Sequence, residues 1–322
     1  MTRGLVPRAM RVVRDAGRGR LAAAALVLAL ALFVAGWDWG RPLGAGTHAR
    51  EIPTADAERG LYDWRAATFA PRVAQDKRIV MIVYDDQTLI ATRKRSPLDR
   101  GLLARALRNL DAMGAHSIGV DILFDQPQDE DNALHAALRT MRTPVWLGYA
   151  NLGDNREQII FEQQQYLDRF IRAARTDRVR PASIRLETDS DNVARSWPTP
   201  QPGQPPLLAL AMRPAAAFAD YRGAIRYRLP QPQPDRSEEP VIPSLQIDLI
   251  ADPAMSAALA PMVRGRDVLI GGDIVDIDQF ETPLSGRGAH STMIGLEVHA
   301  TMLAQVLDGA RLRTVPVGVR WL

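Results

Sequence analysis

Ile79-Val-Met-Ile-Val-Tyr-Asp-Asp86 has the pattern of a buried β-strand that ends in two aspartates. Short apolar runs without alternation are typical of strands that are covered on both faces, as in parallel sheets. Asp99 can cap a following helix whose leucines recur every three or four residues up to Met113. Ser117–Phe124 then predicts a second strand. Strand, helix and strand at this spacing predict a βαβ unit with a right-handed crossover, and therefore an α/β core.

The same alternation continues toward both the middle and the end of the chain. The further strands expected are 145–149, 225–229 and 267–272, and the further helices are 131–141, 157–174, 207–218 and 293–307. Residues 151–240 are rich in Arg, Gln and Pro, which is typical of loops. We therefore expect a mixed, largely parallel sheet flanked by helices and carrying an irregular Pro/Arg-rich insertion at about 151–240.

The N-terminus has the pattern of a membrane anchor. Six arginines in the first twenty residues precede an uncharged stretch that ends at Trp37 and reaches about 25 Å as a helix. Arginines before such a segment keep their end in the cytoplasm. We expect a cytoplasmic tail at 1–20, a transmembrane anchor in the cell membrane at 21–37 and an exported, periplasmic domain at 38–314. A cleaved signal peptide is the alternative.

The last residues leave two alternatives open. Residues 315–322 follow two arginines and could form either a frayed tail or the first turns of a second membrane span.

Composition excludes several classes of function. The chain has no cysteine, so disulfides, thiolate metal sites and cysteine nucleophiles are absent. Much of the net charge of +3 comes from the N-terminal arginines, which argues against a nucleic-acid partner. The chain lacks the phosphate-binding, metalloprotease and serine-hydrolase motifs, and we expect no cofactor.

Aspartates mark the carboxyl ends of the first two strands. Asp85 and Asp86 follow the first strand, Asp125 follows the second, and Asp121 lies within it. In open α/β sheets, ligands bind outside these strand ends, where carboxylates could hold an ion or a cationic ligand. The alternative is that they cap helices or form turns. Asp121 differs, because a carboxylate inside an apolar strand needs a partner.

Two other groups contain candidate ligand residues. Gly271, Gly272 and Asp273 end a predicted strand, where glycine could bring backbone close to a ligand. Glu297 and His299 lie near the start of the last helix, but residues two apart point to different helix faces. We therefore expect His299 to be a packed histidine and Glu297 to favour the positive helix end.

Together these segments resemble the second class of CHASE domains, which are extracellular sensors associated with bacterial cyclases and histidine kinases. The similarity covers roughly residues 63 to 313 and depends on the order of its parts. These are the Asp63-Trp-Arg65 element, residues 79–86, 113–115 and 119–124, a hairpin at 189–196, residues 267–272, the Phe280-Glu-Thr282-Pro283 segment, and Gly295-Leu-Glu297-Val-His299-Ala300.

The resemblance implies a sensor and not an enzyme. Such proteins carry an N-terminal anchor, this exported domain, and further spans that lead to a cytoplasmic cyclase, histidine kinase or Ser/Thr kinase, which this chain lacks. The resemblance therefore favours the start of a second membrane span at 315–322 over a frayed tail. It supplies no ligand, so a small molecule, an ion or a protein remains the expected signal, and a homodimer is possible. The alternatives are an exported metal-dependent hydrolase that uses Asp85, Asp86 and Asp125, and an envelope scaffold without a ligand.

Overall fold

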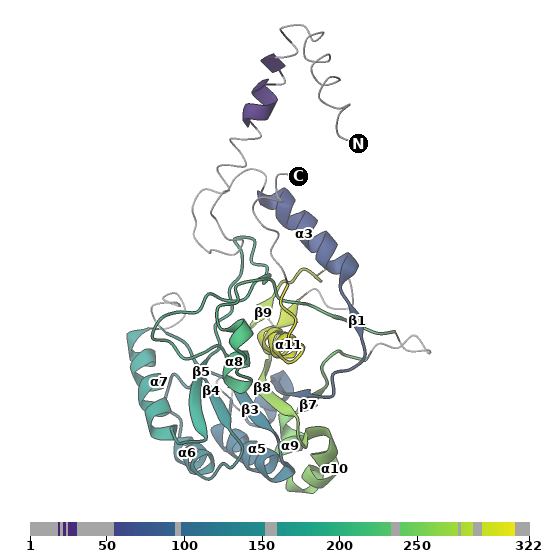
Figure 1. Cartoon of the computed structure of the whole chain (residues 1–322). Coiled ribbons are helices and arrows are strands. Elements are labelled where there is room, and N and C mark those ends of the chain that lie inside the picture. The colour runs from purple at the N-terminus through teal and green to yellow at the C-terminus, as the bar shows by residue number, and fades with distance from the viewer. Residues whose placement is uncertain are drawn as a thin grey trace. The chain divides into compact units, whose positions relative to one another are not determined.

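The structure is a computed structural model, which describes residues 19, 22–23, 25–30, 55–93, 98–151, 160–232, 239–275, 278–285 and 292–312. The chain divides into two compact units. One comprises Met1–Glu58 with Val315–Leu322, and the other is Arg59–Thr314, which contains every strand (Figure 1).

A six-stranded sheet forms the centre of the unit Arg59–Thr314, and all of its neighbouring strands are parallel. Its order is β5-β4-β3-β8-β2-β7. The strands are β2 (Ile79–Asp85), β3 (Ser117–Asp121), β4 (Val145–Tyr149), β5 (Val179–Ser183), β7 (Ser244–Gln246) and β8 (Asp267–Asp273). Because the strands are parallel, all their carboxyl ends lie at one edge, which positions the candidate site.

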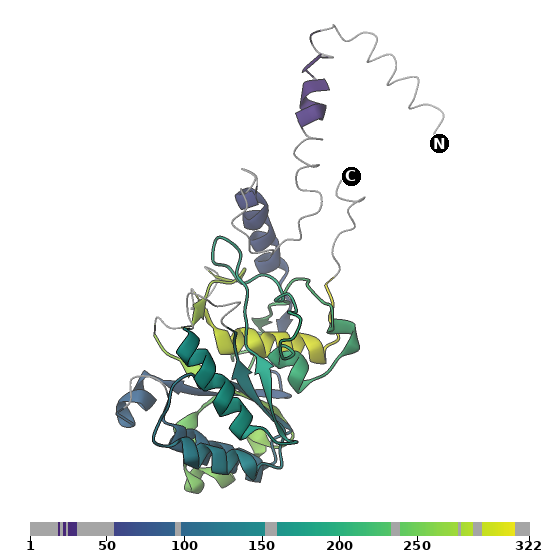
Figure 2. The ribbon, with the colours of Figure 1, turned by 90° about the vertical axis from the view of Figure 1, so that its left-hand side faces the viewer.

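Helices and irregular segments bury both faces of this sheet, as the run at Ile79 predicts. Val80 and Ile82 pack on one face, and Ile79 and Met81 pack on the other. The first face is covered by α5 (Arg100–Met113), α6 (Asp131–Arg139), α7 (Phe161–Ala174), α9 (Ile247–Ala251) and α10 (Pro253–Val263). The second is covered by α8 (Leu208–Met212), α11 (Gly295–Leu307) and residues of the irregular segment. Figure 2 shows α11 lengthwise along one side of the sheet.

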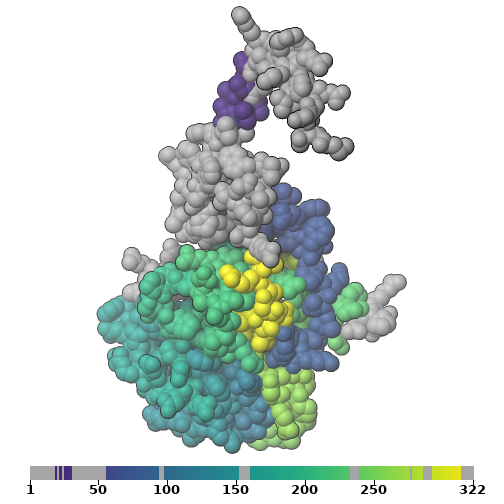
Figure 3. All heavy atoms as spheres, in the orientation of Figure 1, coloured from purple at the N-terminus to yellow at the C-terminus, as the bar shows by residue number. Residues whose placement is uncertain are grey.

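Helix α3, which has 15 residues, and several short elements complete the structure around this core. They are α3 (Ala55–Phe69), α4 (Asp86–Ala91), a 3₁₀ turn at Ala216–Phe218, β1 (Arg72–Val73) paired with β6 (Leu229–Pro230), and β9 (Gln279–Phe280) paired with β10 (Met293–Ile294). Figure 3 shows that residues near both ends of this unit, blue and yellow, reach the same face of it.

Most of the expected regular elements are confirmed. Asp99 caps α5 by accepting from the backbone N–H of Leu102 at 2.7 Å, and Gly114 ends α5 with a φ of 81°. Helix α6 and strands β4 and β8 lie where expected. However, β8 lies between β2 and β3 in the sheet, so the expected βαβ unit does not place its two strands side by side.

The middle of the chain differs from expectation. β5 adds a strand to the main sheet beside β4, and α7 packs on one face of this sheet. The irregular part therefore begins after Ser183 and not at residue 151. The helix expected at 207–218 is divided into α8 and a 3₁₀ turn, because Pro214 interrupts it. Of the strand expected at 225–229, only Leu229 is in a strand, as part of the two-residue β6. The backbone N–H groups of Ile225 and Arg226 donate instead to the carbonyl of Arg195 and to the side chain of Gln305.

The predicted anchor lies mostly outside the described residues. Within 21–37 the structure describes only residues 22–23 and 25–30, which are helical. In the parts of the chain that are described, no helix combines the length and apolar character needed to cross a membrane. The predicted second span at 315–322 is also outside the described residues.

Candidate functional site

Four titratable side chains gather near the carboxyl edge of the sheet. Tyr84 comes from β2, Asp121 from β3, Asp278 from the turn before β9, and His299 from the second turn of α11. Asp121 alternates with Val120 along β3, so it faces the α11 side of the sheet, and in register it pairs with Gly271 of β8. The fold thus places a carboxylate beneath a helix.

Asp121 and His299 are buried next to each other without a normal hydrogen bond between them. Their side chains are 8% and 2% exposed, and Oδ1 of Asp121 lies 4.0 Å from Nε2 of His299. Nε2 lies 3.1 Å from the carbonyl oxygen of Ile184, which can only accept, so Nε2 carries the proton. Nδ1 is then a lone-pair acceptor, and it is buried with no partner among the described residues.

Asp278 approaches the same place from a strained turn. Its φ of 55° is unusual for a residue with a side chain, and its backbone carbonyl accepts from the N–H of Gly295 at 2.9 Å. A side chain at Gly295 would collide with Oδ2 of Asp278. Gly295 is therefore required for this carboxylate to rest against the first residue of α11.

Burial dominates the ionisation of the cluster. It raises the pKa of Asp121, and burial together with the charge of Asp121 raises the pKa of Asp278. Asp278 keeps one side exposed, and the amino end of α11 favours its charge, so we regard Asp121 as the more perturbed of the two. Burial lowers the pKa of His299 to about 4, so this ring is neutral at pH 7. Burial, with both aspartates, raises the pKa of Tyr84.

The three other predicted aspartates of this edge act separately and do not join this cluster. Asp85 caps α4, accepting from the backbone N–H of Thr88 at 2.9 Å and from its hydroxyl at 3.2 Å. Asp86 accepts from the backbone N–H of Val275 at 3.2 Å. Asp125 accepts from Nε2 of Gln163 at 2.7 Å. The contact of Asp85 agrees with the alternative interpretation as a helix cap, whereas Asp86 and Asp125 each bind a segment distant in the sequence.

The two glycines near the end of β8 allow side chains of other elements to pack against this strand. A Cβ at Gly271 would lie 2.8 Å from Cδ1 of Leu296, so glycine there lets α11 approach the sheet. A Cβ at Gly272 would lie 3.2 Å from the hydroxyl of Tyr84. Asp273 pairs in register with Asp85 at the exposed end of β8.

Glu297 lies two residues before His299, in the first turn of α11, and its charge acts on Tyr227. Burial raises the pKa of Tyr227, and the charge of Glu297 adds to this effect. Across the described part of the chain, no group of three His, Asp or Glu residues could hold a metal ion. The arrangement at Asp121 is therefore a pair of acids beside a neutral imidazole.

Arg195 forms a second polar centre, which sequence reasoning did not single out. It is 6% exposed, yet it binds three carboxylates. It donates to Asp63 at 2.8 and 2.6 Å, to Asp189 at 2.7 Å, and to Asp191 twice at 2.7 Å. Burial alone would lower the pKa of Arg195, but these carboxylates raise it. Asp63 lies on α3, so Arg195 fastens that helix to the 189–196 hairpin.

The other residues of the family-like segments have structural roles or face solvent. Arg65 is exposed on α3. Thr282 is 5% exposed; its backbone N–H donates to the hydroxyl of Ser285 at 2.9 Å, and its own hydroxyl accepts from the N–H of Leu284 at 3.2 Å. Pro283 is part of this turn.

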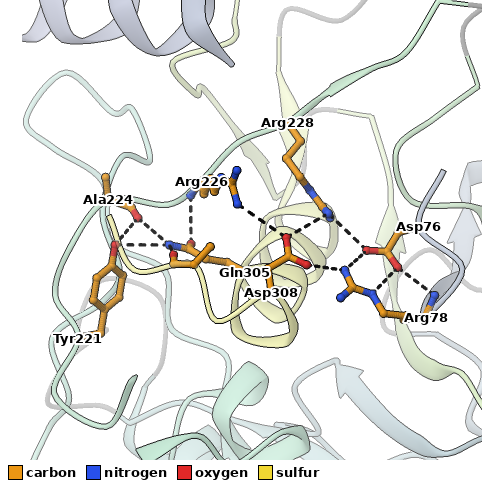
Figure 4. A network of polar contacts seen from close by, with 9 residues as sticks. Asp76, Arg78, Tyr221, Ala224, Arg226, Arg228, Gln305 and Asp308 are labelled. Carbon is orange, nitrogen blue, oxygen red and sulfur yellow. Dashed lines mark hydrogen bonds and ion pairs between the residues drawn. The ribbon is translucent and has the colours of Figure 1, made fainter. Parts of the chain in front are cut away.

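The carboxyl end of α11 is held by a polar network (Figure 4). Asp308 accepts from Arg78 at 2.8 Å and lies 3.8 Å from Arg228, while Asp76 pairs with the same two arginines at 2.7 and 3.4 Å. Gln305, one turn earlier, is 2% exposed. Its amide bonds the indole of Trp197, the backbone N–H of Arg226, and the carbonyls of Ala224 and Ala310. One helix therefore links the acid cluster to this network.

Replacement of Asp121 by Asn is expected to stabilise the domain at high pH. The folded-state pKa of Asp121 is raised, so its contribution to stability is fully present below the ordinary carboxyl pKa and is lost as the pH rises through the raised value. Relative to the parent, Asp121→Asn should gain about 2 kcal/mol in the free energy of unfolding at about pH 8 and almost nothing at about pH 4. Urea unfolding at the two pH values measures these free energies, with Asp273→Asn as the control. A gain that does not change with pH would contradict this assignment.

Replacement of Arg195 should have the opposite effect. Arg195→Met leaves three carboxylates unpaired and is expected to cost about 3 kcal/mol in the free energy of unfolding. The exposed Arg65 on the same helix provides the control, since Arg65→Met should change this free energy by no more than about 0.5 kcal/mol. Equal losses for the two variants would show that the three-carboxylate contact contributes nothing.

Comparison with known protein families identifies the family of this chain. The family model for the CHASE2 domain matches residues 28–322, which is most of the sequence. No curated protein matches the chain, and no solved structure does. The matched region includes all the sequence segments on which the resemblance depends, from Asp63 to residue 313. The chain belongs to the CHASE2 family, whose members are extracellular sensory domains of signalling receptors and not catalytic domains.

Proposed function

We propose that this chain is the exported, ligand-binding region of a bacterial membrane receptor and that Asp121 is the centre of its sensory site. Residues 21–37 would anchor it with the basic tail 1–20 in the cytoplasm. It would regulate a cytoplasmic cyclase or kinase module that lies outside this sequence. Family membership supports the sensory role. The apolar stretch after six arginines supports the anchor, and Leu26 and Leu30 are 68% and 63% exposed in its helical part.

The buried carboxylate of Asp121 is the observation that carries the choice of site. A charge inside a protein costs free energy unless it is paired and hydrogen-bonded, and Asp121 has no hydrogen-bond donor among the described residues. Structural needs alone would favour an apolar residue at this position of β3. Strongly perturbed carboxyl groups next to a histidine are typical of functional sites.

Helix α11 offers a physical route from this site toward the membrane. His299 in its second turn faces Asp121, and Gln305 and Asp308 near its end enter the network of Figure 4. The chain then continues toward residues 315–322, which the sequence suggests could begin a second span. A ligand that binds better to one position of α11 than to another would shift the equilibrium between them.

The alternatives gain less support from the structure. A hydrolase that uses Asp85, Asp86 and Asp125 requires these carboxylates to meet, whereas each accepts hydrogen bonds from a different segment. A scaffold without a ligand gives no reason for the uncompensated carboxylate of Asp121.

The absence of cysteine makes the proposed topology directly testable. Asp177→Cys places a thiol in an exposed turn before β5, and Thr2→Cys places one in the basic tail. In intact spheroplasts, a membrane-impermeant maleimide should label the first variant, which should stay in the membrane fraction, and should label the second only after lysis. The cysteine-free parent is the control. Labelling of Asp177→Cys only after lysis would rule out an exported domain, and its release from the membrane would rule out the anchor.

A further inference from the structure

One side of helix α3 is apolar and uncovered. Leu61 and Trp64 are 57% and 52% exposed, and Phe69 at the end of the helix is 75% exposed. Spacings of three and four residues place Leu61, Trp64 and Thr68 along the same side of the helix. Figure 1 shows that α3 lies outside the layers that cover the sheet. Two large apolar side chains in water would gain free energy from burial against a partner.

The opposite side of α3 is fixed to the domain. Asp63 pairs with Arg195 at 2.6 Å, and Ala67 is only 6% exposed. Because these two residues face the domain, the helix cannot turn to bury Leu61 and Trp64 without breaking the contact with Arg195. The contact therefore holds the apolar side outward, where another molecule can bind it.

The charges beside the apolar side indicate the partner. Glu58 and Arg65 are both exposed, and their spacing of two heptad-like turns places them on the same flank of α3. Two antiparallel helices related by a twofold axis bring this flank of both copies together in opposite directions. Glu58 of each copy then lies beside Arg65 of the other, and Leu61 of each copy packs against Trp64 of the other.

Other occupants fit these charges less well. A parallel pair would place the charged flank against the opposite flank of the second helix, where Gly60 and Ala67 carry no charge. α3 also has more acidic than basic residues, whereas helices that lie on an anionic membrane surface are rich in Lys and Arg. The pattern is therefore complementary to a second copy of α3 in the antiparallel orientation.

We propose that α3 is a homodimer interface in which the α3 helices of two copies of this chain pack antiparallel. A single helix pair is small compared with the roughly 1,200–2,000 Å² of most stable complexes. The inference therefore rests on the anchor in the proposed function, because two copies held in one membrane meet at a high local concentration. Since Arg195 fastens α3 to the 189–196 hairpin, the interface joins the exported domains of the two copies.

Disulfide trapping in native membranes tests the arrangement, because the chain has no cysteine of its own. Ala57→Cys and Thr68→Cys are both at exposed positions and lie about 16 Å apart along the helix. Two differently tagged copies of the full chain, each with one of these substitutions, are expressed together and oxidised with copper phenanthroline. Ala57→Cys should cross-link to Thr68→Cys, and neither variant should cross-link to itself. Cross-links of each variant to itself without the mixed product would overturn the antiparallel interface, and so would the absence of any cross-link.

Substitutions test the two parts of the interface. Trp64→Glu places a charge in the apolar side and should reduce the mixed cross-link at least about tenfold. Ile90→Glu is the control, since Ile90 is 75% exposed on α4, and it should leave the yield unchanged. Glu58→Arg or Arg65→Glu alone should reduce the yield about threefold, and both in the same chain should restore it.

Two results of these substitutions would overturn the proposal. They are equal yields for Trp64→Glu and Ile90→Glu, and no restoration by the double charge reversal. Both Trp64 and Ile90 are at least half exposed, so each variant is expected to fold.

Failure of the interface and failure of the proposed receptor give different results. If Asp177→Cys is labelled from outside the spheroplast and no mixed cross-link forms, the exported domain is supported and the α3 interface is overturned. If the chain is released from the membrane or is labelled only after lysis, the proposed topology is contradicted, and the interface loses the anchor on which it rests.

Discussion

The carboxylate of Asp121 is the constraint around which this domain is arranged. β3 is a central strand of a sheet buried on both faces, and Asp121 pairs in register with Gly271, which has no side chain to compensate a charge. An acid there is unfavourable for folding, because no cation compensates it. Neutral His299 supplies no compensating charge, and burial instead raises the pKa of Asp121 and of Asp278, which favours their protonated forms. Such local conflicts with folding are expected at functional sites.

Two polar centres of a different kind hold the elements around that site. At Arg195 one guanidinium compensates three carboxylates and fixes α3, which follows the predicted anchor in the sequence. At Asp308, arginines from two other segments fix the end of α11 (Figure 4). Both centres have charge partners with good geometry, and Asp121 has none. This contrast separates the contacts that stabilise the domain from the carboxylate that we propose as the centre of the sensory site.

The sequence predicted the parts that depend on local patterns. The apolar run at Ile79 gave β2, and Asp99 and Gly114 marked α5, because strand burial and helix capping are determined by neighbouring residues. The insertion of β8 between β2 and β3 depends on contacts distant in the chain, which no local pattern contains. Asp121 was a predicted candidate, whereas His299 was expected only to be packed and Asp278 was not predicted. Asp278 reaches the site from a turn outside any strand or helix pattern, and its position depends on contact with Gly295.

The most direct measurement is the output of the intact receptor, followed as cyclic nucleotide formation or phosphotransfer in response to its stimulus, in Asp121→Asn compared with Asp273→Asn. If Asp121 is the centre of the sensory site, Asp121→Asn is present in the membrane at the parent level, and its output no longer changes with the stimulus. Asp273→Asn, altered at the same edge of the sheet, responds like the parent. An unchanged response in Asp121→Asn would contradict the account.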